Sequence, residues 1–116
     1  MKYLITGGAG FLGAKLTEKL LRNKKNKIYI IDNFSKKKIN KDTLRILKNK
    51  NVKLIKKDLN FISDYLKVYN FDFIFHFAAI LGVQKVIDNP LITLRDNIQT
   101  TINLINFSKK QKNLKK

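Results

Sequence analysis

A glycine-rich segment near the amino terminus has the residue types and spacing of a turn that binds phosphate groups. Gly8, Gly10 and Gly13 fit the pattern G-x-G-x-x-G, and Gly7 directly precedes them. Glycine tolerates positive φ in a tight turn, and a position without a side chain lets a diphosphate reach the backbone N–H groups at a helix start. A glycine triplet by itself indicates only a strand-to-helix turn, so the prediction of a dinucleotide site depends on its surroundings.

Asp32 supplies the second half of that pattern. It follows Gly13 by about 20 residues, the separation at which a carboxylate accepts hydrogen bonds from an adenosine ribose. The same carboxylate would repel a ribose 2′-phosphate, so the sequence favours NAD over NADP as the cofactor. The lysines at positions 36–38 have the opposite charge preference and leave NADP open as the alternative.

The segments that must position these residues alternate between strand and helix patterns. Short apolar runs predict strands at Lys2–Thr6, Lys27–Asp32, Val52–Lys56 and Phe71–Phe77. Apolar residues near helical spacing predict helices at Phe11–Asn23, Ile39–Lys50, Ile62–Tyr69 and, after a break at Asn89-Pro90, Leu91–Ser108. Strands that are apolar on both faces indicate a parallel sheet with helices on both faces. Right-handed crossovers then predict one doubly wound α/β (Rossmann) domain of about four strands in the order 3-2-1-4.

Further motifs follow the glycine segment in a fixed order along the chain. They are Asp32-Asn33, Asp58-Leu59, His76-Phe77-Ala78-Ala79, and Pro90 followed by Asn97. Together with Thr6–Gly13, these residues resemble the NAD-dependent epimerases and dehydratases of the extended short-chain dehydrogenase/reductase family, which act on nucleotide sugars. The resemblance runs from Met1 to about Lys110 and is much more specific than the glycine turn alone.

The resemblance implies a role in cofactor binding for each motif. In the family the glycine turn lies on the diphosphate, the pair after the second strand on the ribose, and the acidic pair after the third strand on the adenine. The end of the fourth strand lies beside the cofactor, and the helix Asn near the floor of the active site. The implied cofactor-binding residues are Gly7, Gly10, Phe11, Leu12, Gly13, Asp32, Asn33, Asp58, Leu59, Phe77, Ala78, Ala79 and Asn97.

Several of these residues also have ordinary structural interpretations. Asp58 could cap a helix, and Asn97 could be a plain helix residue. His76 is expected to be a packed or hydrogen-bonded residue at a strand end rather than a catalyst. A single histidine and no cysteine also leave little basis for a metal site.

The family's catalytic pair is missing from the sequence. In the family a Tyr, with a Lys four residues later, carries out the proton transfer that accompanies hydride transfer to NAD. The residues four positions after the four tyrosines are Gly7, Asn33, Tyr69 and Phe73. We therefore expect no catalytic residue here and interpret residues 1–116 as a partial NAD-binding domain that lacks the catalytic region and the C-terminal substrate domain. The sugar and the reaction (epimerisation, dehydration, decarboxylation or reduction) stay open.

The expected partners follow from this partial character. The complete family implies a nucleotide-sugar substrate. The strand Phe71–Phe77 would form a long apolar sheet edge, which natural proteins normally protect, so it suggests a fragment or half of a protein completed by another chain. The resemblance also implies a possible homodimer through the helix Leu91–Ser108. A stand-alone NAD-binding or partner module without catalysis is the alternative.

The composition limits the remaining classes of function. The chain carries 25 Lys and Arg against 8 Asp and Glu, a net charge of +17, while 44% of its residues are hydrophobic. Such charge allows a basic nucleic-acid-binding protein as a second alternative. Only three of the cations are Arg, the residue suited to bidentate base contacts, so no specific nucleic-acid partner is expected. No apolar run is long enough to span a membrane, and a cytoplasmic location is expected.

Overall fold

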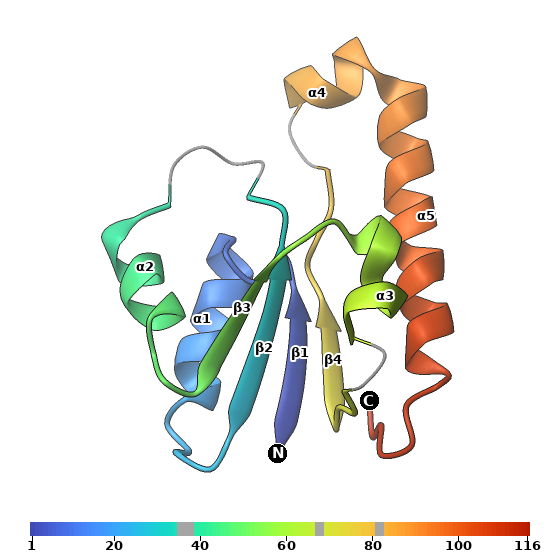
Figure 1. The fold of residues 1–116 in the computed structure, drawn as a ribbon. Helices are drawn as coiled ribbons and strands as arrows, with labels where there is room; N and C mark the ends of the chain where they lie inside the picture. Colours follow the sequence, from blue (N-terminus) through green and yellow to red (C-terminus); the bar gives the residue numbers. More distant parts are fainter. Residues whose placement is uncertain (35–38, 67–68, 81–82) are drawn as a thin grey trace.

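In the computed structural model, the described residues are 1–34, 39–66, 69–80 and 83–116, and among them four parallel strands form one central sheet (Figure 1). The strands are β1 (Lys2–Thr6), β2 (Lys27–Asp32), β3 (Val52–Lys56) and β4 (Phe73–His76). Their order is β3-β2-β1-β4, as predicted. Thr6 pairs with Ile31 of β2 and with His76 of β4, so the carboxyl ends of these strands meet at one edge of the sheet.

Helices cover both faces of the sheet, which confirms the doubly wound arrangement. They are α1 (Phe11–Leu20), α2 (Lys41–Leu47), the 3-10 turn η1 (Leu59–Phe61), α3 (Ile62–Leu66), α4 (Val83–Asp88) and α5 (Pro90–Ser108). Figure 1 shows α1 and α2 on one side of the sheet and α3 and α5 on the other. None of the helices in the described ranges is long and apolar enough to cross a membrane.

In the described part of the chain, buried hydrophobic residues form a cluster on each face of the sheet. On the α1–α2 face, Ile5, Ile28 and Ile30 are fully buried against residues of both helices. On the opposite face, Leu104 and Phe107 of α5 pack with a second set of buried residues: Leu4, Ile31, Leu59, Ile62, Leu66 and Phe71. Successive side chains of each strand point to opposite faces of the sheet and are buried on both. The strands that carry the loops at the carboxyl edge are therefore held in place from both faces.

Two predicted helices are shorter than expected, and side chains bond to backbone groups at the ends concerned. The predicted helix Phe11–Asn23 ends at Leu20, whose carbonyl oxygen accepts a hydrogen bond of 2.9 Å from the Asn26 side chain. The predicted helix Ile39–Lys50 begins only at Lys41, since the Asn40 side chain caps the Thr43 amide at 2.7 Å. Side-chain oxygens at a helix start and amides at a helix end satisfy backbone groups that the helix itself leaves unpaired.

The other predicted elements differ from the observed ones in smaller ways. The helix predicted at Ile62–Tyr69 is described only as far as Leu66, because residues 67–68 lie outside the described ranges. The long helix starts at Pro90, one residue earlier than predicted, and the short helix α4 (Val83–Asp88) was not predicted at all.

The strand predicted at Phe71–Phe77 is shorter than expected, and its outer edge is partly covered. Phe71 is fully buried and its amide donates to Gln111 Oε1 at 3.0 Å instead of joining the sheet. Along the outer edge, Lys115 N donates to Asp72 O at 2.8 Å and Ile74 N donates to Lys116 O at 2.9 Å. The strand β4 is therefore at the edge of the sheet, as predicted, but the backbone at its start is bonded to Lys115 and Lys116.

The helix α5 presents an apolar stripe away from the sheet. Five of its exposed apolar side chains recur at helical spacing and are 45–80% exposed: Leu91, Leu94, Ile98, Ile102 and Ile105. The residues of α5 that join the core, Leu104 and Phe107, lie on a different face. A homodimer through this helix stays a prediction.

Candidate functional site

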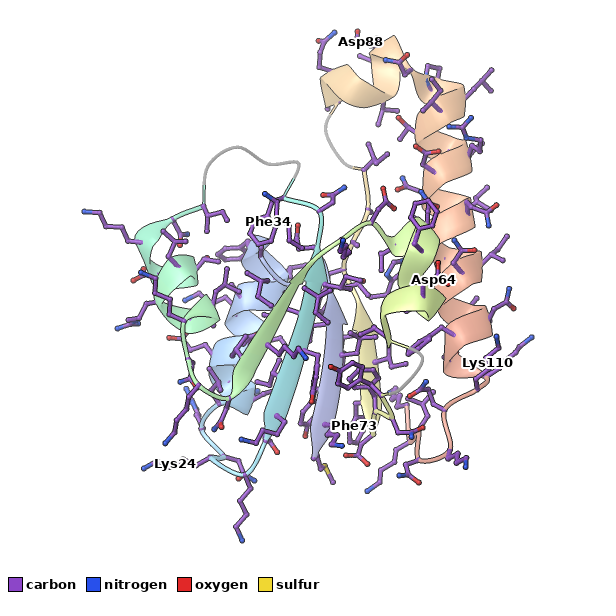
Figure 2. The ribbon with its side chains drawn as sticks, viewed as in Figure 1. Lys24, Phe34, Asp64, Phe73, Asp88 and Lys110 are labelled. Atoms are coloured by element: carbon purple, nitrogen blue, oxygen red, sulfur yellow. The ribbon has the colours of Figure 1, made fainter. Side chains whose placement is uncertain are left out.

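A cavity of about 350 Å³ lies where the strands β1, β2 and β4 end. Its size is within the range of small-molecule sites. Figure 2 shows Phe34, which lines the cavity, beyond the end of β2, whereas Phe73 lies at the opposite end of the sheet. Most of the predicted cofactor residues line this one cavity: Gly7, Gly10, Phe11, Asp32, Asn33, Asp58, Leu59, Phe77, Ala78, Ala79 and Asn97.

Gly7 forms the turn that leads out of β1. Its φ is +66°, and its amide donates to Ile31 O at 2.8 Å. A Cβ at this position would lie 2.6 Å from Ala78 N and 2.7 Å from the carbonyl carbon of Phe77. The backbone conformation and the close approach both exclude a side chain, so glycine is what lets this turn lie against the end of β4.

Gly10 stands at the amino end of α1, beside the cavity. No side chain caps this end of the helix, and the first backbone bond of α1 runs from Ala14 N to Gly10 O at 2.9 Å. The amides of a first helical turn have no partner within the helix, and the helix dipole makes this end positive. The arrangement is therefore suited to bind an anion such as a diphosphate.

Leu12 and Gly13 do not line the cavity. Leu12 is 62% exposed on the outside of α1. A Cβ on Gly13 would lie 2.5 Å from Gly8 Cα, so Gly13 allows the helix to pack against the glycine turn. Each successive residue of a helix is turned by about 100° around the helix axis. This rotation explains why Leu12 and Gly13 lie outside the cavity although they belong to the motif.

The Asp32 carboxylate points toward the glycine turn. Its Oδ2 accepts a hydrogen bond of 3.0 Å from Ala9 N, and its Oδ1 accepts one of 2.8 Å from Phe34 N. These two backbone bonds hold the carboxylate in one orientation at the cavity wall. Each oxygen can accept more than one hydrogen bond, so both can also receive hydroxyl groups from a ligand.

Asp58 and Leu59 each have a structural role in addition to lining the cavity. Asp58 caps the turn η1, and its Oδ1 accepts from Asn60 N at 2.8 Å. The Leu59 side chain is 7% exposed and belongs to the core on the α5 face. The capping interpretation of Asp58 and its place beside the cavity are thus compatible.

Asn97 joins α5 to the backbone that follows β4. Its Oδ1 accepts from Ile80 N at 2.8 Å, and its Nδ2 donates to Ile80 O at 3.2 Å. The carbonyl oxygen and the NH2 group of this side chain are therefore both bonded to the backbone of one residue. Asn97 lines the cavity together with Ile80.

His76 lies behind this wall and does not border the cavity. Its Nδ1 is 2.6 Å from Thr6 Oγ1, and its Nε2 is 3.3 Å from Thr101 Oγ1. The ring is half-buried, and this burial lowers the pKa of His76 below its usual 6.5. The position is that of a hydrogen-bonded residue at a strand end.

The lowered pKa of His76 predicts a dependence of stability on pH. Just below pH 6.5 the unfolded chain binds more protons at this residue than the folded chain does, so the free energy of unfolding decreases as the pH falls through that range. The slope that one such proton can add is at most about 1.4 kcal/mol per pH unit. Urea unfolding at several pH values between 7 and about 5.5 gives the free energy of unfolding at each. This free energy should fall less steeply with decreasing pH for His76→Gln than for the wild type. The same pH dependence in both proteins would contradict a lowered pKa of His76 in the folded chain.

The sequence motifs missed several residues that line the cavity. Asn40 and Thr43 come from the start of α2, and Asp96 and Thr100 lie on α5 beside Asn97. Thr100 could have been found, because a position three residues after Asn97 shares its face of the helix, and Asp96 lies four residues before Thr100. The lysines at 36–38, which left NADP open, lie outside the described residues.

The sheet order and the glycine turn at its carboxyl edge define a Rossmann-like α/β protein with a candidate nucleotide site at the point where the strand order reverses. The family model for GDP-mannose 4,6 dehydratase matches residues 4–116. The chain therefore belongs to the NAD-dependent epimerase/dehydratase family that this model describes.

Individual relatives agree with this assignment. UDP-glucuronic acid decarboxylase 6 of Arabidopsis thaliana is 32% identical over 111 residues, covering 95% of this chain and 31% of that protein. The crystal structure of UDP-glucuronic acid 4-epimerase from Bacillus cereus, in complex with UDP-glucuronic acid and NAD, superposes with a TM-score of 0.84 at 29% identity, covering 99% and 38% of the two chains. The Bordetella bronchiseptica enzyme WbmF in complex with NAD+ gives 0.80 at 26% identity, covering 98% and 34%. This chain spans about a third of the length of such relatives.

Proposed function

We propose that this chain binds NAD as the amino-terminal part of a protein that modifies nucleotide sugars. The observation that carries the proposal is the pairing of the glycine turn with the Asp32 carboxylate at one cavity, where Oδ2 of Asp32 accepts from Ala9 N at 3.0 Å. An anion site at the start of α1 and a fixed carboxylate beside it match the diphosphate and ribose of a dinucleotide.

Each wall of the cavity suits a different part of NAD. Gly10 and the first turn of α1 would hold the diphosphate, Asp32 and Asn33 the adenosine ribose, and Asp58 with Leu59 the adenine. Phe77–Ala79 and Asn97 would lie along the nicotinamide half. When bound, NAD supplies the hydride acceptor, and the residues of this chain bind and orient it.

The substrate class is proposed from the relatives. Their names refer to UDP-linked sugars, and the family includes decarboxylases and 4-epimerases. No tyrosine of this sequence has a lysine four residues later, so we propose that the proton transfer of a complete enzyme uses residues outside these 116. In this proposal, residues 1–116 form one partial domain that another polypeptide segment completes.

Titration calorimetry of the 116-residue chain with NAD and with NADP tests the cofactor. We expect NAD to bind about tenfold or more tightly than NADP, because a 2′-phosphate near the Asp32 carboxylate meets a like charge that costs on the order of 1–4 kcal/mol. Equal affinity for the two nucleotides would contradict the role given to Asp32. No heat of binding with either, from a chain that is folded by circular dichroism, would contradict the proposed function.

A further inference from the structure

A chain of hydrogen bonds crosses from the end of β1 to α5 through the single histidine of the sequence. At one end, Ala78 N donates to Thr6 Oγ1 at 3.3 Å, and Thr6 Oγ1 lies 2.6 Å from His76 Nδ1. At the other end, His76 Nε2 lies 3.3 Å from Thr101 Oγ1. The ring therefore links the end of β1 to α5.

The number of protons available decides which atoms donate and which accept in this row of hydrogen bonds. The hydroxyl of Thr101 has one proton, and it donates to Asn97 O at 2.8 Å. Thr101 Oγ1 can then only accept from the ring, so His76 Nε2 must carry a proton. In a neutral ring, Nδ1 is then an acceptor, and the Thr6 hydroxyl must donate to it.

The neutral form of the ring is the one that this setting favours. Burial lowers the pKa of His76. Thr6 is fully buried, and among the described residues the hydrogen bonds of its hydroxyl are those with His76 and Ala78. A protonated Nδ1 would remove the acceptor that the Thr6 hydroxyl uses. A buried hydroxyl without an acceptor is unfavourable.

The series of hydrogen bonds continues from Thr101 to residues that line the cavity. Asn97, whose carbonyl accepts from Thr101, also binds both backbone groups of Ile80 through its side chain. Ile80 and Ala78 both line the cavity, as does Asn97. The histidine ring thus connects the hydrogen bonds of Ala78 with those of Ile80, two residues farther along the same segment.

We propose that His76 is a positioning residue, held as the neutral tautomer with its proton on Nε2, that fixes the segment Ala78–Ile80 between β1 and α5. An effect of His76 on ligand binding rests on the proposed NAD site. The tautomer and the local hydrogen bonds do not depend on any ligand. The proposal assigns Thr6 and Thr101 as the two hydroxyls that select the tautomer.

The tautomer is measured directly by long-range ¹H–¹⁵N NMR of the full chain at neutral pH, where the single histidine gives one unambiguous set of ring signals. We expect a protonated Nε2 and an unprotonated, pyridine-like Nδ1. Thr101→Val should weaken this preference and speed hydrogen exchange of the Ile80 amide by roughly 3- to 10-fold, the equivalent of about one neutral hydrogen bond. Thr6→Ser, which keeps the hydroxyl, should retain the wild-type tautomer.

A matched control separates this role from general effects on α5. Ser108→Ala also removes a hydroxyl that donates to an α5 carbonyl, Ser108 Oγ to Ile105 O at 2.7 Å, but far from the ring. It should leave the tautomer and the Ile80 amide unchanged. A proton on Nδ1 in the wild type, or equal effects of Thr101→Val and Ser108→Ala, would overturn the proposal.

NAD titration gives the second readout. Thr101→Val should weaken NAD binding by roughly 3- to 10-fold, and Ser108→Ala should not change it. An unchanged affinity in Thr101→Val, with a wild type that binds NAD, would overturn the role of the ring at the cavity. Failure of the wild type to bind NAD would instead reject the proposed function, and the tautomer measurement would still decide the assignment of His76.

Discussion

Gly7→Ala is expected to lower the free energy of unfolding by about 3 kcal/mol. A residue with a Cβ pays roughly 1–2 kcal/mol for the left-handed conformation, and Gly7 has φ +66°. The new Cβ would also lie 2.6 Å from Ala78 N, and such overpacking costs roughly 1–3 kcal/mol. The measurement is urea or thermal unfolding of the variant beside the wild type.

Gly10→Ala is the matched control for this prediction. Gly10 has φ −74°, which any residue adopts, and its added Cβ would lie 3.2 Å from Gly7 O. We expect this variant to lose about 1 kcal/mol or less of stability. It should still weaken NAD binding, because the methyl group enters the wall where the diphosphate would lie. Similar unfolding midpoints for the two variants would show that the turn does not need glycine at position 7.

Asp32→Ala is expected to raise the dissociation constant for NAD by roughly 30-fold or more. Hydrogen bonds to a charged group contribute about 1.5–3 kcal/mol each, and a ribose offers two hydroxyls to the two carboxylate oxygens. Titration calorimetry with NAD measures the change. The preference for NAD over NADP should decrease as well, because the like charge facing a 2′-phosphate is gone.

Two controls make this result specific. Asp42→Ala removes an equal charge from the first turn of α2, at a residue that does not line the cavity, and it should leave NAD affinity unchanged. Asp32 also accepts hydrogen bonds from Ala9 N and Phe34 N, so unfolding curves must establish that Asp32→Ala is folded under the titration conditions. An affinity within about twofold of the wild type in folded Asp32→Ala would contradict the ribose contact.

The strand order could be predicted from the sequence because it depends on short-range patterns. Runs such as Ile28–Ile31 are apolar on both faces, which requires a covered parallel sheet, and the handedness of crossovers then leaves few orders. The ends of elements depend on contacts between distant residues. The Phe71 amide leaves the sheet because it binds Gln111, forty positions away, and no pattern local to Phe71 contains that information.

The candidate site was predictable to the extent that its motifs lie at strand ends. The glycine turn, Asp32 and the residues after β4 meet because parallel strands bring their carboxyl ends to one edge. The bond between the Asp32 carboxylate and the Ala9 amide could not be predicted, since it depends on the side-chain angle and on the exact path of the turn. Leu12 fits the motif but does not line the cavity, because the rotation of α1 carries it away from the helix start.

The backbone bond between Ile74 N and Lys116 O has a practical consequence for experiments on this protein. A tag fused directly to Lys116 begins beside the open side of β4 and can add itself there as a further strand. A tag fused ahead of Met1 begins next to β1, which already has β2 and β4 as neighbours on its two sides. Purification handles and fluorescent labels should therefore be attached at the amino terminus.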